Sequence, residues 1–265
     1  MQKVLQWGVP NVTEVTNENV GQILYHVTAR DSMAMTTNEK DLNKIEFGLF
    51  IKRGNEEETT VFDGYLGDMI QFLYGGTPMV DVVSGLKSTY SFSLNFSHRF
   101  NIGANDVLRI KTNFGSASNA FTNAEDSRST IVLYTNPSSI PNPENYTAIY
   151  KSFQIPNGDL DFDKNIGTNV AKVLIHTHPT NDFFSGYDTP RPISTEIVAN
   201  AYSSDKQQIE LYTETRDGLG STYGDVQNLI AYNSKSLLTN AKIKIKLDKA
   251  ATVDTKVLVT SYRIA

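Results

Sequence analysis

The residues whose spacing is most typical of metal binding are three aspartates at alternate positions: Asp159, Asp161 and Asp163. Alternate carboxylates open a calcium-binding loop, where they converge on a hard cation. The rest of that loop is missing, because Lys164 replaces the turn glycine and Val170 replaces the bidentate glutamate. We therefore interpret the segment as a strand with Leu160 and Phe162 inward and the carboxylates outward, and we predict no metal site.

Two histidines form a second candidate metal site. His176 and His178 are two residues apart, so on a strand they would share one face and could offer two imidazoles to a metal. A third ligand is not evident, since Pro179 ends the strand before Asp182 is reached. This pattern again predicts no metal site.

A hydrolytic set would have to be assembled from Ser97, His98 and Asp106. Adjacent strand residues point to opposite faces, and no G-x-S-x-G elbow accompanies them, so we predict no catalytic site. His26 and His98 are interpreted as hydrogen-bonded polar positions. The segment Gly218-Leu219-Gly220 lacks the third glycine of a dinucleotide-binding turn, and we expect no cofactor.

Composition favours sheets. The chain has 265 residues, with 13 Tyr, 13 Phe and abundant Asn, Thr and Ser, which suits twisted sheets with polar outer faces. The formal net charge of -5 and the scattered Lys and Arg residues argue against direct binding of nucleic acid.

Sequence features that depend on the cell compartment are few. The chain has no cysteine, so neither disulfides nor Cys-ligated metals can form. The N-terminal segment, residues 1–7, is too short and polar for a signal peptide, and no apolar run is long enough to span a bilayer, so we expect a soluble chain without a cleaved signal. Glycosylation sequons at Asn11, Asn95 and Asn145 are then discounted.

A short helix is predicted at Gly67–Tyr74, and a similar segment recurs at Gly224–Tyr232. Both have the order glycine, aspartate, apolar core and closing tyrosine, and each follows an Asp-Gly turn, at Asp63-Gly64 and Asp217-Gly218. The repeated arrangement predicts a duplicated local plan, with each helix plugging the end of a β-sandwich.

The predicted strands recur in the same way. Val20–Val27 matches Val170–Thr177 in apolar pattern and in the position of its histidine. The other segments expected to form strands, given for the first half and then the second, are a hairpin (45–52 with 59–62; 196–202 with 208–213), an alternating strand (90–97; 242–247) and a final strand (129–135; 255–262). Leu108 and Ile110 are expected on one further strand in the first half, after a turn at 103–106.

The two halves are separated by a segment, 136–144, that contains three prolines. Proline removes backbone donors and fixes extended or turn geometry, so we predict domains at residues 1–138 and 139–265.

A tandem pair of β modules, each with a short helix before its alternating strand, resembles the major capsid proteins of double jelly-roll viruses. It looks most like those of membrane-containing, corticovirus-like icosahedral phages. The residues that carry the resemblance are 61–74 followed by 90–96, and 211–232 followed by 243–247. The likeness covers nearly the whole chain as an order of elements.

This resemblance implies an all-β protein of two tandem eight-stranded jelly rolls with a short helix in each. It implies a non-enzymatic coat subunit that assembles as trimeric pseudo-hexagonal capsomers into an icosahedral shell around an internal membrane. The implied partners are other copies of the chain, minor capsid or vertex proteins and no nucleic acid directly; the implied location is the virion, after synthesis in the host cytoplasm. The segment Met1–Pro10, with Trp7, is hypothesised to reach toward a neighbour or the lipid, the alternative being that Trp7 packs on its own domain.

A second class of function stays open. Two β-sandwich modules with Tyr- and Asn-rich loops would also suit a carbohydrate-binding or adhesion protein. Oligomeric state separates the two, since only the coat protein must form a stable trimer.

Overall fold

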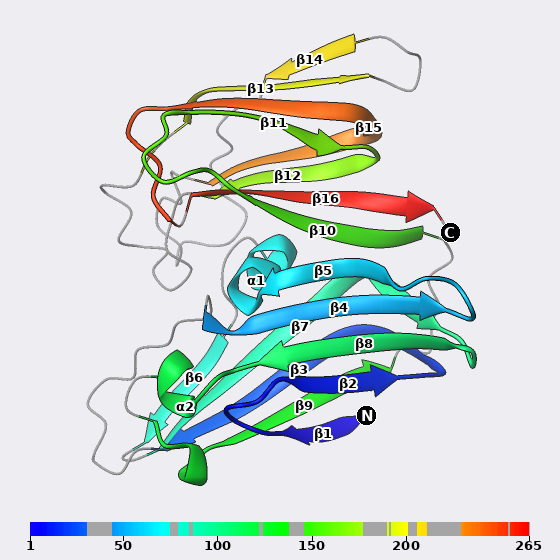
Figure 1. Cartoon of the computed structure of the whole chain (residues 1–265), viewed down its shortest axis with the longest axis vertical. Helices are drawn as coiled ribbons and strands as arrows, with labels where there is room; N and C mark the ends of the chain where they lie inside the picture. Colours follow the sequence, from blue (N-terminus) through cyan, green and yellow to red (C-terminus); the bar gives the residue numbers. More distant parts are fainter. Residues whose placement is uncertain are drawn as a thin grey trace. The chain divides into compact units, whose positions relative to one another are not determined.

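The computed structural model describes residues 1–30, 44–74, 79–84, 87–121, 124–137, 146–176, 190, 192–200, 206–210, 229–253 and 255–264. The chain divides into two compact units, Met1–Thr147 and Ala148–Ala265 (Figure 1). The predicted boundary between residues 138 and 139 falls shortly before this division, and it stays a prediction. No described helix is long and apolar enough to cross a membrane.

The first unit contains two antiparallel sheets. One sheet has five strands in the order β1 (Gln2–Leu5), β9 (Thr130–Pro137), β3 (Glu18–Arg30), β7 (Lys87–Ile102) and β6 (Met79–Ser84). The other has four strands in the order β2 (Asn11–Val15), β8 (Asp106–Asn113), β4 (Glu46–Arg53) and β5 (Thr59–Tyr65). Apart from β6, the first strand pairs with the last and the second with the next-to-last, which is the strand order of a jelly roll.

Aromatic side chains fill the space between these two sheets. Tyr25 on β3 is fully buried, and its hydroxyl lies 2.6 Å from the Thr112 hydroxyl on β8 in the opposite sheet. Its ring meets those of Phe47 and Phe114 edge-on. Burial raises the pKa of Tyr25, with the Thr112 hydrogen bond acting in the opposite direction, so the hydroxyl stays protonated at neutral pH.

The helix predicted in the first half is present as α1 (Leu66–Tyr74). Leu66, Met69 and Ile70 are buried, and the helix packs against β4 and β5 of one sheet and β7 of the other (Figure 1). One side of the sandwich is thereby covered. Two shorter helices, α2 (Ala117–Ala120) and η2 (Asp126–Arg128), lie between β8 and β9.

The second unit repeats this topology. The strands β10 (Tyr146–Gln154), β16 (Lys256–Ile264), β12 (Val170–His176) and the first part of β15 (Leu229–Leu247) follow the order β1-β9-β3-β7. The strands β11 (Asp161–Gly167), the second part of β15, β13 (Pro192–Asn200) and β14 (Lys206–Glu210) follow the order β2-β8-β4-β5. The change between sheets falls near Asn240, whose φ of 50° is a left-handed conformation that asparagine tolerates.

Both units share two backbone irregularities. The central strand of each has a register shift near its start, between Val20 and Gln22 in β3 and between Val170 and Lys172 in β12. The turn after the first strand has a left-handed glycine in each unit: Gly8 donates to the Gly115 carbonyl (2.6 Å) and Gly158 to the Ala251 carbonyl (2.9 Å). Bulges and left-handed glycines at matching places in the two units support a duplicated module.

The helix predicted at Gly224–Tyr232 is wrong over its last four residues. Residues 229–232 belong to β15 and pair with β12, and residues 224–228 lie outside the described part of the chain. A short apolar run suits a buried strand as well as a helix, and here pairing with a central strand decides. The lysine-alternating segment is confirmed as strand, because Ile243, Ile245 and Leu247 are buried in the core of the second unit.

Candidate functional site

Three short turns meet at one end of the first unit. They join β2 to β3, β4 to β5 and β7 to β8, and so connect strands of both sheets. Backbone hydrogen bonds link them directly: Asn17 donates to the Gly103 carbonyl (3.2 Å), and Gly54 donates to the Asn105 carbonyl (3.1 Å).

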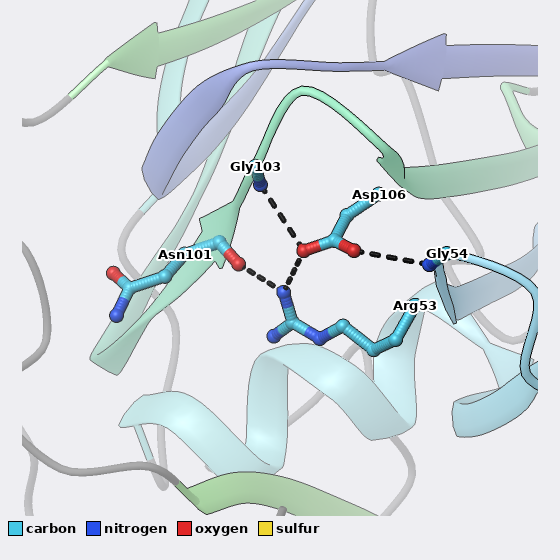
Figure 2. A network of polar contacts seen from close by, with 5 residues as sticks. All are labelled: Arg53, Gly54, Asn101, Gly103 and Asp106. Carbon is cyan, nitrogen blue, oxygen red and sulfur yellow. Dashed lines mark hydrogen bonds and ion pairs between the residues drawn. The ribbon is translucent and has the colours of Figure 1, made fainter.

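The carboxylate of Asp106 lies at the centre of these turns (Figure 2). One oxygen, Oδ2, accepts from the Arg53 guanidinium (2.7 Å) and from the Gly103 amide (3.2 Å), while Oδ1 accepts from the Gly54 amide (3.2 Å). The same guanidinium nitrogen also donates to the Asn101 carbonyl. We call this arrangement of residues 53, 54, 101, 103 and 106 the Asp106 clasp.

Electrostatics keep Asp106 ionised. Burial alone would raise its pKa, but the hydrogen bonds from Arg53 and Gly103, the charge of Arg53 and the Gly54 bond outweigh burial, so the pKa lies below its ordinary value. A carboxylate held this firmly by donors is a weak proton acceptor. The Asp106 carboxylate therefore joins the paired ends of β4 and β8 within one sheet and does not provide a general base. The bond from Arg53 to Asn101 on β7 connects this corner to the other sheet.

Of the three hydrolytic candidates, only the side chain of Asp106 is described, and the prediction of no catalytic site stays a prediction. Ser97 and His98 lie in β7, their side chains are outside the described part of the structure, and the carboxylate is engaged by Arg53. His26 is a hydrogen-bonded polar residue as expected, with Nδ1 3.1 Å from the Ser91 hydroxyl.

The alternating aspartates lie on and just before an edge strand, and lysines neutralise them. Asp163 forms an ion pair with Lys242 (2.8 Å) across β11 and β15, and both side chains are about half exposed. Phe162 is buried as predicted, but Leu160 is 48% exposed, so its predicted inward position is wrong. Leu160 precedes the first paired residue of β11, where strand alternation no longer applies.

Metal binding has no support from the described residues, among which no group of three or more His, Asp or Glu side chains could hold an ion. His176 lies on β12, and His178 and Asp182 lie outside the described residues, as do the glycines at 218 and 220. The side-chain amide of Asn11, the first residue of a sequon, is engaged in hydrogen bonds. It closes the β1–β2 turn by bonds to Gln6 and Val9.

The N-terminal segment does not extend away from its unit, so the hypothesis of a protruding Trp7 is wrong. The indole Nε1 donates to the Ser129 carbonyl (2.9 Å), and the ring packs edge-on against Phe114 and Phe121. The strands on either side of Trp7, β1 and β2, pair with β9 and β8. The hydrogen-bonding partners lie over a hundred residues away, beyond the reach of local sequence patterns.

Sequence reasoning also missed Arg53, the principal partner of Asp106. The turn at residues 103–106 was predicted correctly, and Arg53 was placed at the end of a hairpin strand. The available signal was a pair of opposite charges, Arg53 and Asp106, at two different turns. No local sequence pattern indicates that these two turns meet.

Comparisons with known proteins identify the fold. No protein-family model matches the sequence, and no curated protein matches it. The chain is similar to the STIV MCP, a viral major capsid protein, with 12% identity, a TM-score of 0.55 and coverage of 99% of this chain and 96% of that chain. It is similar to a chain in the atomic structure of Sulfolobus Turreted Icosahedral Virus, with 12% identity, a TM-score of 0.58 and coverage of 100% and 90%. The major capsid protein of bacteriophage PM2 aligns with 10% identity, a TM-score of 0.49 and coverage of 99% and 97%.

The class of fold is therefore the double jelly roll. Two units with the same strand order follow one another along the chain, and the match to the viral chains extends over nearly the full length of both proteins. The predicted all-β fold of tandem jelly rolls is confirmed. Of the helix predicted for the second unit, residues 229–232 are strand and residues 224–228 lie outside the described part of the chain.

Proposed function

We propose that this chain is the major coat protein of an icosahedral virus. The observation that carries the proposal is the full-length match: both jelly rolls align together with a viral capsid chain, and little of either protein is left over.

A duplicated module suits a shell for a geometric reason. Three copies of a chain with two similar units place six similar units around one axis, and a six-sided unit tiles a hexagonal lattice. We therefore propose trimeric, pseudo-hexagonal capsomers.

The proposed role is non-enzymatic. Among the described side chains the most strongly held carboxylate, that of Asp106, is used in a structural ion pair. Two of the lysines on the outer face of β15 pair with carboxylates, Lys242 with Asp163 (2.8 Å) and Lys244 with Glu196 (3.6 Å), which reduces the positive charge that this face offers to nucleic acid.

The finer features of the proposal follow the resemblance in the sequence. We propose that the virus is a bacteriophage with an internal membrane beneath its shell. The further partners are minor capsid or vertex proteins, and the chain is located in the virion after synthesis in the host cytoplasm. A lipid contact through Trp7 is not part of the proposal, because that side chain packs within its own unit.

Sedimentation velocity of the purified chain tests the proposal. We expect one species with the mass of three chains that persists on dilution, and a monomer at every concentration would contradict it. A glycan array run in parallel tests the carbohydrate-binding alternative, which would be supported by a monomer that is retained on sugars.

A further inference from the structure

One side of the first unit carries no cover among the described residues. β1 ends one sheet, β2 ends the other, and no described strand pairs with their outer edges. On the opposite side α1 packs against both sheets. We call the uncovered side, formed by Gln2–Leu5 and Asn11–Val15, the open edge.

The backbone of β1 points hydrogen-bonding groups out of the open edge. Met1 and Thr135 exchange two backbone hydrogen bonds (3.0 and 2.9 Å). This pair determines which residues of β1 direct their backbone groups toward β9. Along an antiparallel strand alternate residues direct their N–H and C=O groups to opposite sides, so Gln2 and Val4 direct theirs away from β9.

Two valines of the open edge are exposed. Val4 is 67% and Val12 46% exposed, and Val9, in the turn between the two edge strands, is 43% exposed. Val4 lies opposite Val132 of β9, which extends the apolar surface onto the neighbouring strand.

The lysine that would normally protect such an edge is exposed, but it is hydrogen-bonded to the neighbouring edge strand. Lys3 is the only charged residue among the first ten. Edge strands commonly use lysine to prevent pairing with other chains. Here its Nζ donates to the Val12 carbonyl on the other edge strand (2.6 Å) and so ties β1 to β2.

We infer that the open edge is the surface on which a second copy of this chain docks. Outward N–H and C=O groups that bind water in the free chain can pair with a neighbouring strand, whereas lipid hydrocarbon offers them no hydrogen bond. In a closed ring of identical chains each copy meets only further copies, so the neighbouring strand belongs to the same protein. This inference rests on the proposed self-assembly.

Two substitutions of Val4 test separately the contribution of its apolar side chain and that of its outward backbone N–H. Val4→Glu places a charge in the apolar surface, and Val4→Pro removes the outward N–H without removing a bond to β9. We expect both variants to melt as the wild type does in circular dichroism. Sedimentation equilibrium should show the trimer dissociating at about tenfold or higher protein concentration than the wild type.

Val253→Glu is the matched control, because Val253 is also 67% exposed but belongs to the second unit and not to the open edge. It should leave the trimer unchanged. If the wild type is trimeric and the Val4 variants associate as tightly, this inference alone is overturned. If the wild type is monomeric, the proposed function is overturned as well. Val4 variants that stay trimeric but no longer float with phosphatidylcholine vesicles would overturn it in favour of a lipid contact.

Discussion

Asp106 accepts hydrogen bonds from Arg53 and from the amides of two different turns, so its negative charge ties the paired ends of β4 and β8 to the turn between β7 and β8. Asp106→Asn keeps the shape but weakens the bond to Arg53, which is charge-assisted. We expect the free energy of unfolding in urea to fall by about 1–3 kcal/mol. Asp163→Asn is the control, because its ion pair with Lys242 is half exposed and should contribute less than about 1 kcal/mol. Equal losses in the two variants would contradict a special role for the clasp.

The same carboxylate makes a specific prediction about pH. The pKa of Asp106 in the folded protein lies below its ordinary value of 3.8. Its contribution to stability is therefore fully present above the unfolded-state pKa and is lost as the pH falls through the folded-state pKa. The difference in unfolding free energy between wild type and Asp106→Asn should stay constant from pH 7 to about pH 5 and shrink below about pH 4. A difference that grows on acidification would reverse the predicted sign.

The buried pair of Tyr25 and Thr112 is expected to behave as a unit. Tyr25→Phe leaves the Thr112 hydroxyl, which is 1% exposed, without its partner and should cost about 1–3 kcal/mol of unfolding free energy. Adding Thr112→Val removes the stranded hydroxyl, so the double variant should recover most of that loss. Purely additive losses in the double-mutant cycle would argue against coupling across the core.

At the scale of elements, two glycines of the first unit should respond oppositely to alanine. Gly8 has a φ of 74°, so Gly8→Ala should lower the unfolding free energy by about 1–2 kcal/mol. Gly21 lies at the bulge of β3, where a Cβ would meet Arg99 at an ordinary 3.5 Å, and the matching residue of β12 is Ala171. Gly21→Ala should therefore change stability by less than about 0.5 kcal/mol. Similar effects at both sites, measured by thermal unfolding, would contradict the equivalence of the two units.

Strands with a clear alternating pattern could be predicted from the sequence. The central strands β3 and β12, the hairpin β4–β5 and the final strands β9 and β16 all lie where apolar residues either alternate with polar ones, as in β3, or form a short continuous run, as in β12 and β16. The helix α1 was also predicted, because its apolar residues follow a helical period and two glycines come after it.

The strands β1, β2 and β10 could not be predicted in this way. They are short or largely polar. What makes them strands is pairing with β9, β8 and β16, which are far away in the sequence. For the same reason the packing of Trp7 and the contact between Arg53 and Asp106 were not foreseen, because both depend on which turns and strands the topology brings together.

At the scale of the whole molecule, the two units carry different features on one plan. The first unit has α1, the Asp106 clasp and an open edge with apolar side chains. The second has a single long strand, β15, that serves both sheets, with lysines paired to carboxylates outside it. A ring built from such chains alternates two kinds of unit, which is why three copies, and not six, should close it.

Electron microscopy of the purified protein tests the coat role most directly. Class averages viewed down the symmetry axis should show particles with three-fold symmetry and a hexagonal outline, in which each chain contributes two adjacent lobes. Isolated two-lobed particles at concentrations where the protein is otherwise folded would contradict the central claim.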